Sequence, residues 1–119
     1  MKYVFLIAAI WNLWGGLNYL FFPEAQAEKM KYPMGNRWES QYIAIMAFVF
    51  CAIYVMIFYS PPAGYLAFVP FFAAAKILIG ISAVYCYRKH NMPLPFSIVF
   101  GGGNFIIGVL FVLYIITFL

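Results

Sequence analysis

This 119-residue chain has very little charge: only 8% of its residues are Asp, Glu, Lys or Arg, whereas 67% are hydrophobic. A typical soluble domain has about 25% charged and about 45–50% apolar residues. With so few charges, a water-soluble fold would be unable to cover its own surface. The composition therefore excludes a soluble globular domain. It predicts an all-α integral membrane protein, a four-helix bundle in a single domain over residues 1–119.

Side chains that bind metals or carry out catalysis are also scarce. The chain has two cysteines, Cys51 and Cys86, one histidine, His90, and three acidic residues. The cysteines form no CxxC pair, which argues against a thiol-redox motif and against a four-ligand metal site. One histidine is too few for both axial ligands of a haem within one chain. We therefore expect no metal, no cofactor and no catalytic set of side chains.

Four long apolar runs make up most of the chain. About 20 apolar residues in a helix cross the hydrocarbon core of a bilayer. By this measure, the predicted spans are residues 3–22, 41–59, 65–87 and 94–118. Lys2 followed by an apolar run resembles a signal peptide, but the apolar part of such peptides has only about 7–15 residues. We therefore expect the first span to be retained as a helix.

The segments between the spans predict how the helices are connected. Residues 60–64 form a short uncharged turn, so we expect the second and third spans to pack as an antiparallel hairpin. Residues 23–40 form the one sizeable loop, within which residues 24–32 are expected to form a short amphipathic piece on the membrane surface. Pro70 is expected inside the third helix, where it would free the carbonyl of Leu66 and kink the helix.

Basic residues exceed acidic ones, giving a net charge of +4, and most of them lie in two loops. These loop residues are Lys29, Lys31, Arg37, Arg88 and Lys89, whereas the opposite side of the membrane would carry only Lys2. The positive-inside rule predicts that the charged loops are cytoplasmic and that both termini are outside. Membrane topology and anionic lipid headgroups account for these charges, so we expect no nucleic-acid partner.

Lys76 is the most informative residue, because it lies near the middle of the third span. Placing a cation there costs on the order of 3 kcal/mol on insertion scales. Ala73, Lys76, Gly80 and Ala83 recur at the spacing of one helical face. Small residues on such a face allow neighbouring helices to approach closely. We therefore expect Lys76 to face the interior of the bundle.

Three asparagines are the candidate partners of this amine: Asn12, Asn18 and Asn104. No carboxylate is predicted at the depth of Lys76. The favoured role for Lys76 is a structural amine that bonds Asn104, Asn12 and a main-chain carbonyl. Two other roles stay open. One is a site for an anionic or carbonyl-bearing ligand, such as a quinone or a lipid headgroup, and the other is a proton-coupled transport residue.

Glycines and deep aromatic residues predict where helices pack. Small residues are enriched where membrane helices approach each other. The glycines expected at such contacts are Gly15, Gly16, Gly80, Gly101, Gly103 and Gly108. Trp11, Trp14 and Tyr54 also lie deep within the spans. Packing is the favoured role for these three rings, and lining a ligand pocket is the alternative.

Several short motifs are spread over nearly the whole chain. They are Ile10-Trp11-Asn12-Leu13-Trp14-Gly15-Gly16, Leu20-Phe21-Phe22-Pro23, Trp38 and Gln41 at the start of the second span, Lys76 and Asn104. Together they resemble a group of small four-helix bacterial membrane proteins, broadly similar to the DoxX-like proteins. The resemblance implies a bacterial inner-membrane location and supplies no reaction. Where those proteins carry an aspartate in the fourth span, this chain has Asn104, which argues against a Lys–Asp ion pair or proton relay here.

The scarcity of catalytic side chains and the small extramembrane mass favour a non-catalytic role. The leading hypothesis is an accessory or structural subunit that packs against a larger membrane complex or against copies of itself. Its expected partners are therefore the lipid bilayer and other membrane subunits or a homo-oligomer. One alternative is a small oligomeric transporter or channel that uses Lys76. Another is a DoxX-like membrane redox protein that handles a quinone or a lipid.

Overall fold

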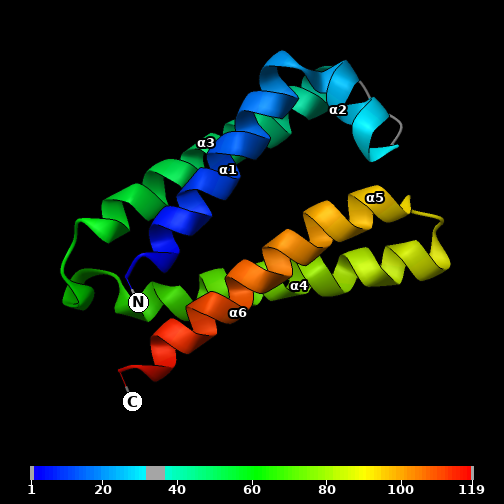
Figure 1. The fold of residues 1–119 in the computed structure, drawn as a ribbon. Coiled ribbons are helices and arrows are strands. Elements are labelled where there is room, and N and C mark those ends of the chain that lie inside the picture. The colour runs from blue at the N-terminus through cyan, green and yellow to red at the C-terminus, as the bar shows by residue number, and fades with distance from the viewer. Residues whose placement is uncertain (1, 32–36, 119) are drawn as a thin grey trace.

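The structure is a computed structural model that describes residues 2–31 and 37–118. Within these residues every regular element is a helix. In chain order (Figure 1) the elements are α1 (Val4–Phe21), α2 (Pro23–Met30), α3 (Arg37–Phe58), η1 (Pro62–Gly64), η2 (Leu66–Phe68), α4 (Val69–Lys89), α5 (Leu94–Phe96), η3 (Ser97–Gly102) and α6 (Gly103–Ile116). η1 and η2 are 3-10 turns, and η3 is a π-helix.

Four stretches of helix are long and apolar enough to cross a membrane: Val4–Phe21, Arg37–Phe58, Leu66–Lys89 and Leu94–Ile116. They begin and end within a few residues of the predicted spans. The last stretch runs without a break through α5, η3 and α6. The expected fold class, an all-α bundle of four membrane-type helices, is therefore confirmed.

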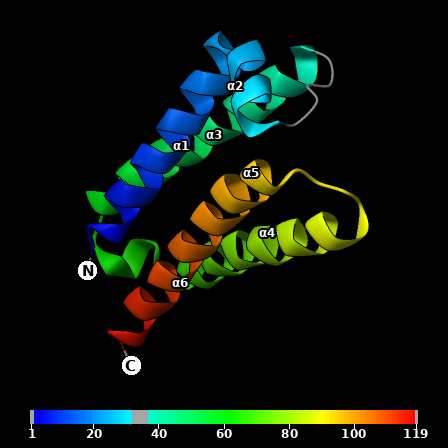
Figure 2. The same cartoon turned by 45° about the vertical axis from the view of Figure 1, so that its right-hand side comes forward.

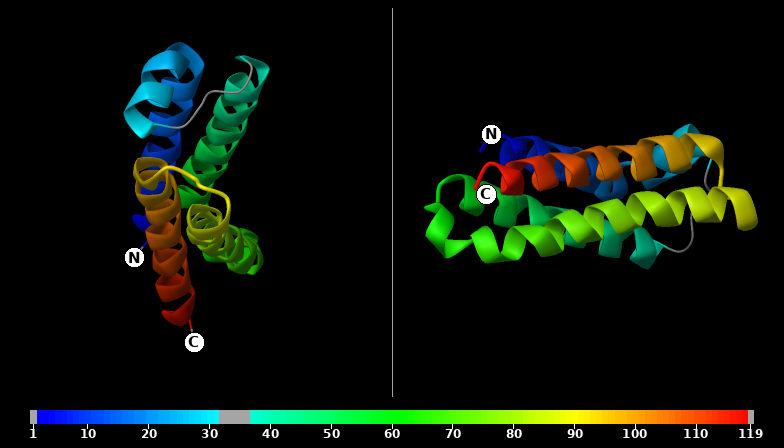
Figure 3. Two further views of the ribbon diagram at one scale, coloured as in Figure 1. Left: turned by 90° about the vertical axis from the view of Figure 1, so that its right-hand side faces the viewer. Right: turned by 90° about the horizontal axis from the view of Figure 1, so that it is seen from below.

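The long helices form two antiparallel pairs that diverge from each other. α3 packs along α1, and α4 packs along η3 and α6. Figures 1 and 2 show that the two pairs meet at the end that holds both chain termini and spread apart toward α2 and α5. α1 and α6 contact each other. Figure 3 (left) shows α3 and α4 on the opposite side of the molecule from α1 and α6.

The predicted hairpin of the second and third spans is therefore wrong. The turn at residues 60–64 does bring the end of α3 to the start of α4, but the two helices then separate (Figure 1). The contact between them is made by large rings. Phe50 and Tyr54 of α3 meet Phe72 of α4, with ring centroids 6.3 and 5.7 Å apart. Contact between α3 and α4 therefore runs through large side chains, whereas close helix–helix contact occurs within the two pairs.

Glycines lie instead in the seams within each pair. A Cβ atom placed on Gly16 of α1 would come within 2.8 Å of the Phe48 ring of α3. A Cβ atom on Gly80 of α4 would come within 2.6 Å of the Cβ atom of Phe105 of α6. Such close approach is the usual basis of helix association in lipid, where apolar burial alone supplies no driving force between helices. Gly16 and Gly80 thus allow the two helices of each pair to approach closely.

The best-buried part of the molecule lies where the two pairs meet. Phe5 of α1 contacts Phe111 and Tyr114 of α6, with ring centroids 5.3 and 5.0 Å apart. The hydroxyl groups of Tyr65 and Tyr114 share a hydrogen bond. At the same end, Lys2 Nζ donates a hydrogen bond to the carbonyl oxygen of Ser60 at 3.1 Å. Stacked rings and paired polar groups therefore close this end of the bundle.

Pro70 lies in the first turn of α4, so the predicted interior proline and kink are wrong. Helix α4 begins at Val69, and the N–H of Val69 donates to the carbonyl of Leu66, the first residue of η2. No carbonyl is freed, because a residue in the first turn of a helix has no intrahelical partner for its N–H in any case. The proline therefore defines where α4 starts.

The predicted amphipathic piece corresponds to α2, which ends at Met30, with Tyr32 outside the described residues. Pro23, Gln26 and Met30 are its buried residues, and its charged side chains are exposed. The helix contacts α1, to which it is joined, and α5 of the other pair. It therefore bridges the two pairs at the end where they are farthest apart.

Candidate functional site: a cleft between the helix pairs

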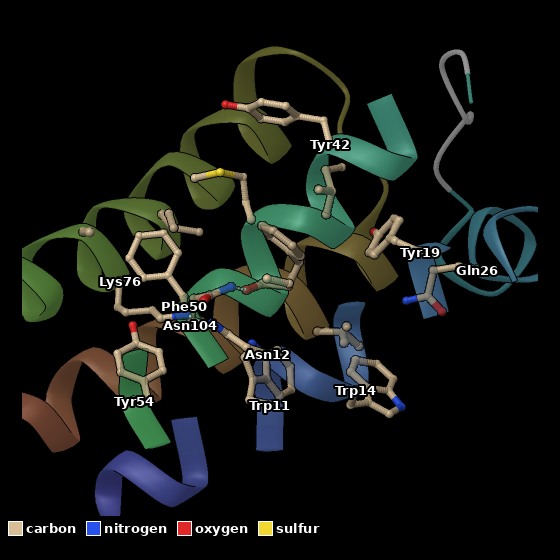
Figure 4. Close-up of a pocket in the computed structure, with 18 of the residues that line it drawn as sticks. Trp11, Asn12, Trp14, Tyr19, Gln26, Tyr42, Phe50, Tyr54, Lys76 and Asn104 are labelled. Atoms are coloured by element: carbon tan, nitrogen blue, oxygen red, sulfur yellow. Dashed lines mark hydrogen bonds between the residues drawn. The ribbon is translucent and has the colours of Figure 1, made fainter. Parts of the chain in front are cut away.

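The space between the diverging pairs is a cleft with a volume of about 310 Å³ (Figure 4). Its walls come from α1, α2, α3, α4, η3 and α6. Its outer rim includes Met46 of α3 and Ile79 of α4, which are 39% and 36% exposed. Pockets for small molecules have volumes of about 300–1,000 Å³ and mainly apolar walls with a few polar groups. The cleft matches this description, and its rim lies on helices that would face lipid.

Lys76 lies at the bottom of the cleft, with only 8% of its surface exposed. Its Nζ atom donates to Asn104 Oδ1 at 2.8 Å and to Asn12 Oδ1 at 3.2 Å. It also lies 5.9 Å from the centroid of the Tyr54 ring, within the range of a cation–π contact. Side chains from α1, α3 and α6 thus surround one amine. These three helices are far apart in the sequence.

The orientation of Asn104 is set by its own helix. Its Nδ2 atom donates to the carbonyl of Phe100 at 2.6 Å, which leaves Oδ1 directed at Lys76. Phe100 belongs to η3, the π-helical stretch Ser97–Gly102. Single π-helical turns within α-helices are frequent at functional sites. Here the π-helical stretch ends two residues before Asn104, which accepts a hydrogen bond from the buried amine of Lys76.

Hydrogen-bond donors remain at the bottom of the cleft. A lysine ammonium has three N–H donors, and two of them have partners in the described residues. The carboxamide of Asn12 accepts from Lys76 through Oδ1, and its Nδ2 group, which lines the cleft, makes no hydrogen bond within residues 2–31 and 37–118. The bottom of the cleft therefore offers N–H groups to a ligand that carries oxygen acceptors.

Two opposing free energies at this site are of similar size. A hydrogen bond to a charged group contributes about 1.5–3 kcal/mol net. Two such bonds, from Asn12 and Asn104, are of the same size as the cost of placing Lys76 at this depth, on the order of 3 kcal/mol. In the described residues no main-chain carbonyl accepts from Nζ, so the third partner expected for a purely structural amine has no counterpart here.

The deep aromatic residues line the cleft. Trp11, Trp14 and Tyr54 all contribute to its walls, as Figure 4 shows. Tyr54 also packs on Phe111, with centroids 5.5 Å apart, so it serves both as core and as wall. Trp11 lies against Gly103 of α6 and closes the side of the cleft where α1 and α6 meet. The alternative role, pocket lining, therefore describes these rings better than packing alone.

The remaining predicted site residues lie elsewhere. Asn18 points away from Lys76 and donates from Nδ2 to the carbonyl of Trp14 in its own helix at 2.7 Å. Gly15 lines the cleft, with open space where a Cβ atom would be. The other predicted glycines contact a neighbouring helix: Gly16, Gly80, Gly101, Gly103 and Gly108.

Gln26 is a site residue that sequence reasoning missed. It lines the cleft from α2, is only 3% exposed, and its side chain makes no hydrogen bond within the described part of the chain. Figure 4 shows its amide directed from α2 toward the cleft. The available signal was the spacing of Pro23, Gln26 and Met30, which places all three on one face of a short helix.

The structure thus has four helices that are long and apolar enough to cross a membrane, with a mainly apolar cleft between them. Comparisons with protein-family models, with curated proteins and with solved structures find no match to this chain. Over residues 2–31 and 37–118, no three His, Cys, Asp or Glu side chains come together as a metal site. The function of the cleft is therefore inferred from the chemistry of the residues that line it.

Proposed function

We propose that this protein is a non-catalytic membrane protein that binds an amphiphilic molecule from the bilayer in the cleft between its helix pairs. The observation that carries the proposal is the position of Lys76. Its amine is held by Asn12 and Asn104 at the bottom of a cleft whose other walls are almost entirely apolar. An apolar pocket with a few convergent polar groups is the usual form of a small-molecule site.

The donors at the bottom of the cleft define the part of the ligand that binds there. Lys76 and the Nδ2 group of Asn12 are donors, so the ligand presents a carbonyl or carboxylate oxygen to them. The aromatic and aliphatic walls fit the apolar body of the same molecule. A lipid-like acid or a quinone has both parts. Since the rim residues Met46 of α3 and Ile79 of α4 are partly exposed, the ligand enters sideways between these helices from the membrane.

The proposed location is a bacterial inner membrane, with both termini outside and the charged loops in the cytoplasm. The shared position of the two termini at one end of the bundle supports this arrangement (Figure 1). Lys29, Arg37, Arg88 and Lys89 belong to the opposite end, as the positive-inside rule favours. Association with a larger membrane complex or with further copies, as an accessory subunit, stays a prediction from the sequence.

The test is ligand binding by the purified protein in mild detergent. A fatty acid brominated along its chain should quench the fluorescence of Trp11 and Trp14 in a saturable manner, because both rings line the cleft. Lys76→Met should weaken binding at least about tenfold, the effect of one lost hydrogen bond to a charged group. Lys89→Met, which removes an exposed lysine, is the matched control.

Extraction of the wild-type protein with organic solvent, followed by mass spectrometry, tests the same proposal without a chosen probe. A lipid-like molecule with an oxygen acceptor should co-purify with the wild type and with Lys89→Met, and should be depleted in Lys76→Met. Quenching that is equal in all three proteins, together with identical extracts, would overturn the proposal.

A further inference from the structure

The cleft has a second polar end, formed by Gln26. This side chain is nine-tenths or more buried, lines the cleft and makes no hydrogen bond within the described residues. Building on the proposed function, we propose that the ligand is an elongated amphiphile with a polar group at each end. One end is the acceptor bound by Lys76 and Asn12, and the other is a hydroxyl or similar group bound by Gln26.

The two polar ends are too far apart for a single headgroup to bridge. Asn12 and Phe21, at the end of α1, are nine residues apart, which corresponds to about 14 Å along a helix. Gln26 follows Phe21 by five residues in the chain, on α2, at the end of the cleft where α2 contacts α5. The wall between the two ends includes Trp14 and Met46, which present apolar surface to the cleft. The ligand therefore has an apolar middle of corresponding length.

The amide group of Gln26 determines which ligand groups it can bind. Its Nε2 group provides two donors and its Oε1 atom provides an acceptor, so it can bond a hydroxyl group in either direction. A buried amide without partners is costly, and a ligand that supplies one recovers part of that cost. Because α2 is amphipathic and carries exposed charges on its other face, this end of the cleft lies near the membrane surface. The ligand's second polar group thus lies at the interface.

An ω-hydroxy fatty acid has the required pattern, and an ordinary fatty acid of the same length lacks only the second polar group. The experiment compares the two acids at several chain lengths, by displacement of the brominated fatty acid from the full-length protein in detergent. Wild-type protein should bind the ω-hydroxy acid about fivefold more tightly at the best chain length, as one neutral hydrogen bond allows. At short chain lengths the two acids should bind equally.

Gln26→Met keeps the size of the side chain and removes its hydrogen-bonding groups. It should abolish the preference for the ω-hydroxy acid, so that the two acids bind with equal affinity at every chain length. Gln41→Met, which changes an exposed glutamine of α3, should leave the preference intact. Saturable binding of the ordinary acid also shows that Gln26→Met is folded.

The outcomes separate this inference from the proposed function. If the ordinary acid binds in a manner that depends on Lys76, but no chain length favours the ω-hydroxy acid, the inference is wrong and the proposed function stands. A preference that persists in Gln26→Met also overturns the inference. If neither acid displaces the brominated probe, or if the probe itself fails to bind, both proposals fail.

Discussion

The two ends of the bundle use the same kinds of residue in different ways. At the end with the termini, Phe5, Phe111 and Tyr114 fill the space between the helix pairs, and Phe111 has no exposed surface. At the other end, Trp14 and Phe50 face a cleft. Both regions are aromatic and apolar, so composition alone does not distinguish a packed core from a pocket.

The two ends of the bundle differ in what their aromatic rings contact. At the closed end, rings from α1 and α6 contact one another directly. At the open end, α3 and α4 diverge beyond the contacts of Phe50 and Tyr54 with Phe72, and α2 contacts α5 across the gap. In a membrane, lipid is as apolar as the side chains, so an open apolar cleft costs much less than it would in water. A diverging bundle is therefore a stable solution here.

Phe111→Ala tests the closed end and should have the largest effect on stability. Phe→Ala in a core costs about 3–5 kcal/mol, and we expect the lower part of that range because burial from lipid lacks the hydrophobic term. Met46→Ala, on the rim of the cleft, should change stability little. Equilibrium unfolding in mixed micelles with SDS measures both. Equal losses would mean that the two ends are packed alike.

Asn104→Leu tests the polar bottom of the cleft and should have the next largest effect. The substitution removes the acceptor 2.8 Å from Lys76 Nζ, and the loss of a hydrogen bond to a charged group costs about 1.5–3 kcal/mol. Asn18→Leu is the control, because that amide bonds only its own helix. The same unfolding experiment applies. A loss no larger than that of the control would show that Lys76 does not depend on Asn104.

Gly101→Ala compares a packed seam with the cleft and should have the smallest of the three effects. A Cβ atom at Gly101 collides with that of Ala83 in α4, and overpacking of this kind costs about 1–3 kcal/mol. Gly15→Ala should be neutral or slightly stabilising, because a Cβ atom there extends into the open cleft. If both substitutions destabilise equally, the cleft is closed in the folded protein.

Much of the fold followed from the sequence because it depends on local properties. The length of each apolar run set the four helices. The spacing of Ala73, Lys76, Gly80 and Ala83 predicted the face that the structure buries. Two of the three candidate asparagines reach Lys76. The third, Asn18, lies too far along α1, and the depth of a residue in a span was not enough to show that.

The pairing of the helices did not follow from the sequence, because a short turn fixes only the ends of the helices it joins. Residues 60–64 are compatible with a hairpin, but the bulk of Phe50, Tyr54 and Phe72 keeps α3 and α4 apart. The role of Gln26 also depends on tertiary structure. It is buried because α2 folds back across the cleft to reach α5, a contact that nothing in the local pattern indicates.

The π-helical stretch Ser97–Gly102 changes the angular phase of the fourth span. Each residue of an α-helix advances by about 100°, so one extra residue in a turn rotates everything after it by about that angle relative to everything before it. The segment ahead of the stretch can then meet α2, while Asn104 behind it faces Lys76. Deleting a single residue from this stretch would swing the amide off the amine and turn a different flank of α6 toward its neighbours.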